Sequence, residues 1–169
     1  MCIRDRLINA DKDVVWGTIP NIKNIKPEEL TWNISHSIGL PKPLSARTPS
    51  LAVGGIRDLE WEKGVHFQEV ISEIKVEELL AYDVLVDQES MKIAELDTHI
   101  VVGDKYFDVL SGFYSLDTVD GQTSLTLSTT YRMTTNLNWY GEWLADFVLD
   151  DFHSAVLTLI KHRVEGANS

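Results

Sequence analysis

Residues 136–166 read NLNWYGEWLADFVLDDFHSAVLTLIKHRVEG, and this stretch decides the fold. Apolar residues recur in it every three or four positions, so they share one wide face of a long helix. That face comprises Tyr140, Leu144, Phe147, Val148, Phe152, Ala155, Val156, Leu159 and Ile160, and the opposite side comprises Glu142, Asp146, Asp150, His153 and Lys161. Asn136 can cap the first turn, and Gly166 can end the helix. Because such a face must be buried against a large partner, we expect a sheet to cover it.

Length and composition fit one globular domain over residues 1–169. The chain is 44 % hydrophobic and 24 % charged, which is enough apolar material for a sizeable core. Its formal net charge of -11 would repel phosphate backbones, so we expect no nucleic-acid partner. No apolar run approaches the roughly 20 residues that span a bilayer. The single cysteine, Cys2, excludes an internal disulfide, so we expect a cytoplasmic location, while the oligomeric state stays open.

Residues 1–6 read MCIRDR, which resembles a translated sequencing-adapter remnant. We therefore treat them as a candidate non-native leader, in which case a natural segment would precede Leu7. The first expected strand, about residues 2–9, would then be partly formed by this leader.

Two short helices are expected after the first strand. Asp11 or Asp13 can cap a helix that Pro20 ends, and Pro27 can open a second helical turn. Residues 39–49 contain three prolines, which favours an extended connector.

A turn at residues 62–64, Glu-Lys-Gly, predicts a hairpin and the register of its two strands. Counting outward places three pairs on one side of the sheet, namely Trp61 with Val65, Leu59 with Phe67 and Arg57 with Glu69. The other side carries Asp58, Glu60, His66 and Gln68 and faces solvent. Since charges on an apolar face are costly unless paired, we expect Arg57 and Glu69 to form a partly solvated pair.

Further hairpins extend the antiparallel sheet to about six to seven strands. A turn near Glu77 and Glu78 brings back a strand whose inward residues are Leu80, Tyr82, Val84 and Val86. Residues 87–103 stay unassigned apart from a β-prone run at 98–102. Asp120-Gly121 predicts the last hairpin, with the inward pairs Leu116 with Leu125, Tyr114 with Leu127, Gly112 with Thr129, Leu110 with Tyr131, and Asp108 with Met133.

This order of elements resembles the helix-grip fold of the START/SRPBCC superfamily, which includes polyketide cyclases and the birch-pollen-allergen type. Residues 10–16, ADKDVVW, resemble its opening strand and helix, and Gly55-Ile56-Arg57 with Trp61, Gly64, Phe67 and Glu69 resemble its second and third strands. The resemblance covers residues 7–165. It implies an α+β fold in which a curved antiparallel sheet wraps around the C-terminal helix. It also implies a cavity between them for a lipid, polyketide or other apolar molecule.

The expected binding site is a mostly apolar pocket with a few convergent polar groups, suited to a small apolar or amphipathic molecule. Its expected ligand-binding residues are Arg57, Leu59, Trp61, Phe67, Glu69, Tyr82, Tyr114, Thr129, Tyr131, Trp143 and Phe147. Arg57 and Glu69 would anchor a carboxylate or phenolate, or they would form a structural ion pair between two strands. No cofactor is expected.

Two other functions stay open. A cyclase or dehydrase-type enzyme would use Glu69 or Asp108 as its general base, with the tyrosines stabilising an enolate. A protein-interaction module would instead need an exposed apolar patch.

Among the histidines, His99 is the one expected to approach a cavity. His66 faces solvent in the predicted hairpin, and His36 lies near the proline-rich connector.

A divalent metal could in principle bind Asp146, Asp150 and His153, which are spaced four and three residues apart on the helix. Glu142 continues this row, which favours an ordinary solvated stripe. We therefore expect no metal.

Overall fold

The computed structural model describes residues 1–30, 41–86, 107–133 and 138–167 of the chain. In chain order its elements are β1 (Cys2–Ile8), α1 (Lys12–Thr18), η1 (Pro27–Glu29), β2 (Pro43–Arg47), β3 (Ile56–Trp61), η2 (Glu62–Gly64), β4 (His66–Lys75), β5 (Leu79–Val86), β6 (Phe107–Val119), β7 (Gln122–Met133) and α4 (Asn138–Ala167).

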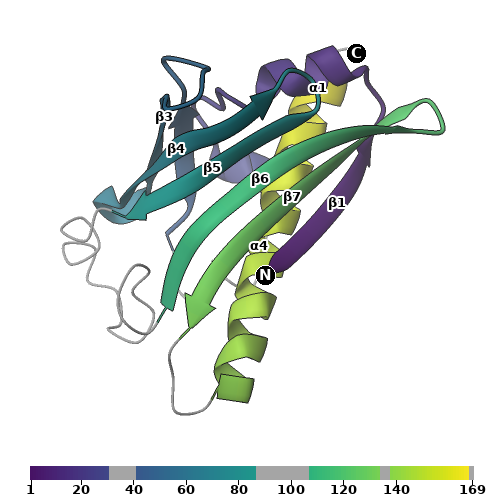
Figure 1. Cartoon of the computed structure of the whole chain (residues 1–169). Helices are drawn as coiled ribbons and strands as arrows, with labels where there is room; N and C mark the ends of the chain where they lie inside the picture. The colour runs from purple at the N-terminus through teal and green to yellow at the C-terminus, as the bar shows by residue number, and fades with distance from the viewer. Residues whose placement is uncertain (31–40, 87–106, 134–137, 168–169) are drawn as a thin grey trace.

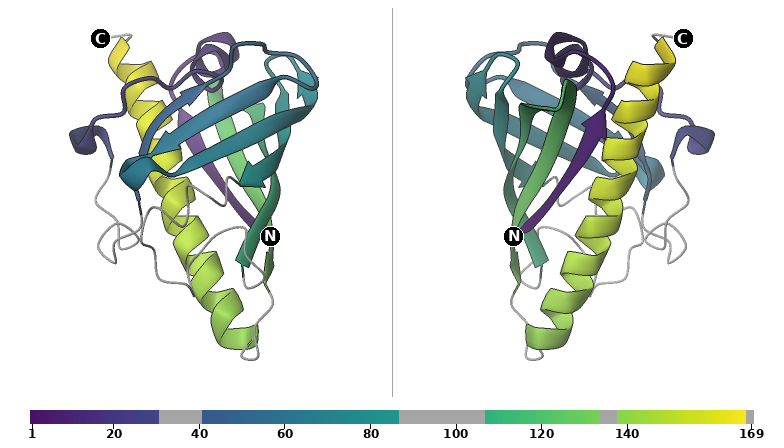
Figure 2. Two further views of the ribbon diagram at one scale, coloured as in Figure 1. Left: turned by 90° about the vertical axis from the view of Figure 1, so that its left-hand side faces the viewer. Right: turned by 90° about the vertical axis from the view of Figure 1, so that its right-hand side faces the viewer.

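The seven strands form one antiparallel sheet in the order β1-β7-β6-β5-β4-β3-β2. Figure 1 shows that the sheet is strongly curved, and Figure 2 shows α4 running along its concave side. The N-terminal end of α4 extends past the ends of β6 and β7 (Figure 2). This is the α+β helix-grip architecture that the sequence predicts.

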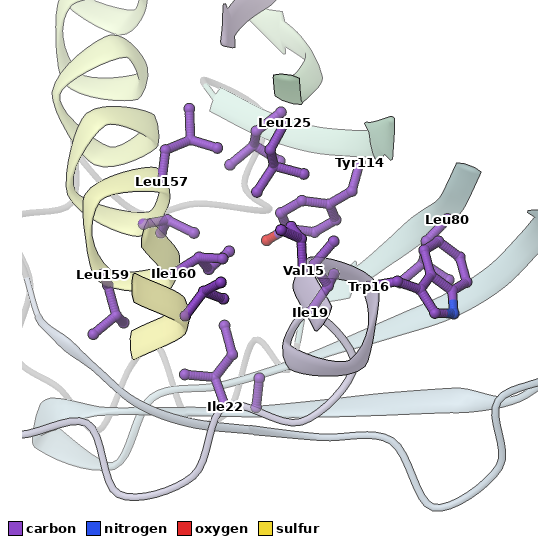
Figure 3. Packing of buried hydrophobic residues seen from close by; sticks show 14 of the residues in the cluster. Val15, Trp16, Ile19, Ile22, Leu80, Tyr114, Leu125, Leu157, Leu159 and Ile160 are labelled. Carbon is purple, nitrogen blue, oxygen red and sulfur yellow. The ribbon is translucent and has the colours of Figure 1, made fainter. Parts of the chain in front are cut away.

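The core fills the end of the sheet where α1 packs. Side chains from α1, the sheet and the second half of α4 converge there, as Figure 3 shows for Val15, Ile19, Tyr114, Leu125 and Ile160. Each of these residues is at most 4 % exposed. Interiors packed this closely leave little room for a ligand, so a binding site would have to lie toward the other end of α4.

The prediction that α4 has one buried face is wrong for its second half. Residues 155–160 are all buried, because β1, β7 and α1 contact the helix from different sides. His153, expected on the polar side, is fully buried, whereas Phe147, expected on the apolar side, is 38 % exposed.

The register predicted for the first hairpin is confirmed. Arg57 pairs with Glu69 and Leu59 with Phe67, and the Trp61 amide donates to the Val65 carbonyl at 2.9 Å. Lys63 and Gly64 have φ angles of 59° and 73° in the turn. These left-handed conformations explain the glycine.

The register of the last hairpin is confirmed only as far as Ser111. Val119 pairs with Gln122 and Gly112 with Thr129, as predicted. A β-bulge between Val109 and Ser111 then shifts the pairing by one residue, so Val109 pairs with Tyr131. Because one extra residue reverses the direction of every later side chain, the predicted inward placement of Asp108 and Leu110 is wrong.

The expected connector at residues 39–49 contains an edge strand, β2. Pro43 lacks an amide hydrogen, and edge strands are where a sheet tolerates proline. The segment at residues 22–25 covers the free edge of β2. Ile22 and Ala46 exchange backbone hydrogen bonds, and the Ile25 amide donates to the Leu44 carbonyl. The chain turns after Leu51, and β3 begins at Ile56.

Helix α4 covers the opposite edge of the sheet. Lys161 Nζ donates to the Leu7 carbonyl at 2.8 Å, and the Asn9 amide donates to Glu165 Oε1 at 2.8 Å. Both sheet edges are therefore occupied by other parts of the chain.

In the four described ranges no helix has the length and hydropathy needed to cross a bilayer.

Candidate functional site

Arg57 and Glu69 form a closed ion pair on the concave face. Arg57 Nη1 donates to Glu69 Oε2 at 2.5 Å, and Nη2 donates to the Ile19 carbonyl at 3.0 Å. The guanidinium carbon lies 5.5 Å from the Tyr114 ring centroid. Arg57 is 2 % exposed and Glu69 is 7 % exposed. The expectation of a partly solvated pair is wrong, because Ile19 and Tyr114 contact the guanidinium and help to exclude solvent.

Electrostatic interactions within the pair keep Arg57 positively charged although it is buried. Burial raises the pKa of Glu69, while the Arg57 charge and its hydrogen bond oppose that rise. Burial lowers the pKa of Arg57, but the charge of Glu69, the neighbouring Tyr114 and Tyr82 and the hydrogen bond to Glu69 together outweigh burial and raise it, so Arg57 stays protonated. The pair therefore joins β3, β4 and the end of α1 as one unit.

Tyr82 and Tyr114 lie beside the ion pair, with ring centroids 6.0 Å apart. Burial raises the pKa of both phenols, so both are neutral at physiological pH. Gly112 pairs with Tyr82 across the sheet, and a Cβ at Gly112 would lie 2.7 Å from the Tyr82 hydroxyl oxygen and 2.6 Å from the Ser128 carbonyl oxygen. Glycine at this position therefore leaves the space that the phenol occupies.

A second buried polar contact joins β7 to α4. Thr129 Oγ1 and His153 Nε2 are 2.7 Å apart, and His153 is 0 % exposed. Within the described ranges His153 Nδ1 is buried and has no hydrogen-bond partner. Spacing on the helix placed His153 on the polar side, and the sequence signal that could have corrected this is the run of apolar residues that follows it.

Burial lowers the pKa of His153 to about 4, with Asp150 opposing and Arg4 adding to the shift. The unfolded chain binds a proton near the usual pKa of about 6.5, so stability falls as the pH drops from about 6.5 toward 4. Above that pH range His153 is neutral in both the folded and the unfolded chain, so this loss of stability is absent.

We expect this histidine to remove about 2 to 3 kcal/mol of unfolding free energy between pH 7 and pH 4. His153→Gln should lose that part of the pH dependence, whereas His66→Gln, at an exposed position, should retain it. Urea titrations at several pH values measure the difference. Parallel pH curves for all three proteins would contradict the assignment.

An aromatic cluster lies on the inward face at the end of β3. The Trp61 ring stacks on Phe152 of α4 with centroids 5.2 Å apart, and Phe67 meets Trp61 edge-on at 5.4 Å. All three side chains are half-buried, as are the neighbouring inward residues Leu59, Val84 and Val86. Trp61 Nε1 is buried and has no hydrogen-bond partner in the described part of the chain.

The remaining expected ligand-binding residues lie further along α4 and β7. Tyr131 donates to Asp146 Oδ1 of α4 at 2.8 Å. Trp143 and Phe147 stack on each other at 5.9 Å and are 59 % and 38 % exposed. The structure therefore separates the predicted site residues into a buried group around Arg57, the half-buried aromatic cluster and an exposed pair on α4.

The candidate general base Asp108 lies on the other face of the sheet. The bulge turns it outward, where Arg132 donates to Asp108 Oδ2 at 2.8 Å.

The described residues contain no group of three or more His, Cys, Asp or Glu side chains able to hold a metal ion. His99 and His36 lie outside the described residues.

An open groove runs beside β2, with a volume of about 510 Å³. Its lining is mostly polar and includes Lys23, Arg47 and Glu60. A groove of this kind does not offer the apolar enclosure that was expected between sheet and helix.

Solved structures share this fold at low sequence identity. Ara h 8.0201 aligns over 97 % of this chain and 96 % of its own, with a TM-score of 0.58 and 10 % identity. The KanY protein (ms6282) aligns over 98 % of this chain and 97 % of its own, with a TM-score of 0.57 and 13 % identity. DynU16, described as a protein in the dynemicin biosynthetic locus, has a TM-score of 0.50 and 11 % identity, and this chain spans 47 % of its length. No protein-family model and no curated protein sequence matches the chain. The likeness establishes the helix-grip fold.

Proposed function

We propose that this domain binds a small apolar or amphipathic molecule between the sheet and α4, at the aromatic cluster of Trp61, Phe67 and Phe152. The observation that supports this is that the cluster faces inward and yet is only half-buried. Apolar side chains on an interior face are normally covered. A flat ligand beside Trp61 would cover them.

Of the expected contact residues, Leu59, Trp61 and Phe67 would touch such a ligand. Arg57, Glu69, Tyr82, Tyr114 and Thr129 would form the closed floor beyond it, since the residues of this group are all buried. The last three expected contact residues would lie toward the N-terminal end of α4, namely Tyr131, Trp143 and Phe147.

The enzymatic alternative receives less support. Glu69 accepts a hydrogen bond from Arg57 and Asp108 lies on the outer face, so neither carboxylate is placed as a free interior base. The exposed Trp143 and Phe147 pair is the apolar surface on which a protein-interaction module would depend.

The proposal is tested with N-phenyl-1-naphthylamine, a neutral dye that fluoresces in apolar surroundings. We expect saturable binding of one molecule, seen by fluorescence titration and by native mass spectrometry. Trp61→Ala should weaken binding roughly ten-fold, because it removes a stacking aromatic surface. Leu85→Ala changes a residue that is 54 % exposed on the outer face and serves as the matched control. Absence of saturable binding, or equal affinity in wild type and Trp61→Ala, would contradict the proposal.

A further inference from the structure

Arg57 is the positive charge on β3, the strand that also carries Trp61, and Glu69 neutralises it. Arg57, Leu59 and Trp61 alternate along β3 and share its inward side. Across the inward faces of β3, β4 and β5, which the structure describes completely, the charged side chains are Arg57 and Glu69. Arg57 gives one hydrogen bond to Glu69 and one to the Ile19 carbonyl. Arg57 Nε is buried without a partner in the described ranges, but the side chain is only 2 % exposed, so its charge is offset by Glu69 and shielded from a ligand at the cluster.

The first half of α4, which carries Phe152, has acidic residues and no lysine or arginine in its sequence. Asp146, Asp150 and Asp151 flank Phe147 and Phe152 on α4, and the chain carries a formal net charge of -11. Asp150 pairs with Arg4 at 2.8 Å, so the charges of these two residues offset each other. An anion entering from solvent would meet unfavourable potential and would lose its hydration without a counter-charge.

The cluster does offer a neutral donor. Trp61 Nε1 carries a hydrogen that can only be donated, and this atom is buried without a partner in the described ranges. A ligand carbonyl or hydroxyl oxygen beside the indole edge would satisfy it. An unsatisfied buried donor favours a ligand that supplies an acceptor over one of the same shape that does not.

Resting on the proposed function, we propose that the site selects uncharged, flat amphipathic molecules that carry a carbonyl or hydroxyl acceptor for Trp61, and discriminates against carboxylates, sulfonates and phenolates. Arg57 sets this selectivity by being bound to Glu69. It does not anchor an anion.

Two matched probe pairs test the selectivity. N-phenyl-1-naphthylamine and 8-anilinonaphthalene-1-sulfonate differ by the sulfonate, and we expect the neutral dye to bind at least about ten-fold more tightly. Fluorenone and fluorene differ by the carbonyl, and as competitors of the neutral dye we expect a preference of about five-fold for fluorenone. Trp61→Phe keeps an aromatic ring without the N–H and should abolish the fluorenone preference.

Glu69→Gln tests the role of the ion pair, because it removes the counter-charge and leaves Arg57 cationic. In this variant the sulfonated dye should gain affinity relative to the neutral dye by at least about five-fold. Circular dichroism checks that the variant is folded. If it does not fold, the affinities of the wild-type protein for the two dyes and the two competitors, together with the Trp61→Phe result, still test the proposed selectivity.

If neither dye binds the wild-type protein, the proposed function fails and this inference fails with it. If the neutral dye binds but the sulfonated dye binds equally well, only the inference is overturned. A fluorenone preference that persists in Trp61→Phe likewise overturns the acceptor assignment alone.

Discussion

Arg57→Met is expected to lower the free energy of unfolding by about 4 kcal/mol, because it leaves the buried Glu69 carboxylate without its partner. Glu69→Leu should have a similar cost, since Arg57 would then be a buried cation that keeps its hydrogen bond to the Ile19 carbonyl but has lost its counter-charge. Replacing both residues together should restore most of the loss, because two apolar side chains need no compensation. Urea unfolding of the four proteins gives the coupling energy directly.

Arg132 supplies the control for this cycle, since it forms an equivalent cross-strand pair with Asp108 on the outer face. Its side chain is 67 % exposed, so Arg132→Met should cost less than about 1 kcal/mol. If Arg57→Met were no more costly than Arg132→Met, the pair would have to be solvated and the selectivity inferred from it would fall.

Leu157→Ala is expected to lower the unfolding free energy by roughly 3 to 4 kcal/mol, through lost apolar burial and the cavity left behind. Leu157 is 0 % exposed and lies where α4 meets the sheet and α1 (Figure 3). Chemical denaturation measures the change. Leu85→Ala, the same substitution at a 54 % exposed position, should cost less than about 1 kcal/mol.

Equal losses at Leu157 and Leu85 would contradict the close packing around α4. A large loss at Leu157 with unchanged affinity for N-phenyl-1-naphthylamine would support the division of the interior into a filled core and a separate binding end.

The hairpins were predictable because their turns set the register. Glycines at positions 64 and 121 mark the turns, and alternation then fixes which side chains face each other, including Arg57 and Glu69. The bulge near Leu110 was not predictable in this way, since it contains no glycine or proline and the adjacent Gly112 pairs in the predicted register with Thr129. One extra residue there moved Asp108 from the inner to the outer face.

The site was only partly predictable for a related reason. Helical periodicity assumes that one face is buried, but the second half of α4 is enclosed by β1, β7 and α1, and the sequence does not say how many neighbours a helix has. Periodicity therefore predicts a solvent-facing His153. Burial of the Arg57 pair also depends on the backbone of Ile19, which lies 38 positions earlier in the chain.

The pairing of β1 with β7 also affects how the protein is made. Cys2 lies opposite Thr129 and Ile8 opposite Thr123, so the first of the seven strands to be synthesised pairs with the last of them. The hairpins of β3, β4 and β5 are local and can form early, whereas closing this long loop is slow. During synthesis β1 therefore stays unpaired until residues 122–133 emerge, and its junction with β7 and α4 is completed last.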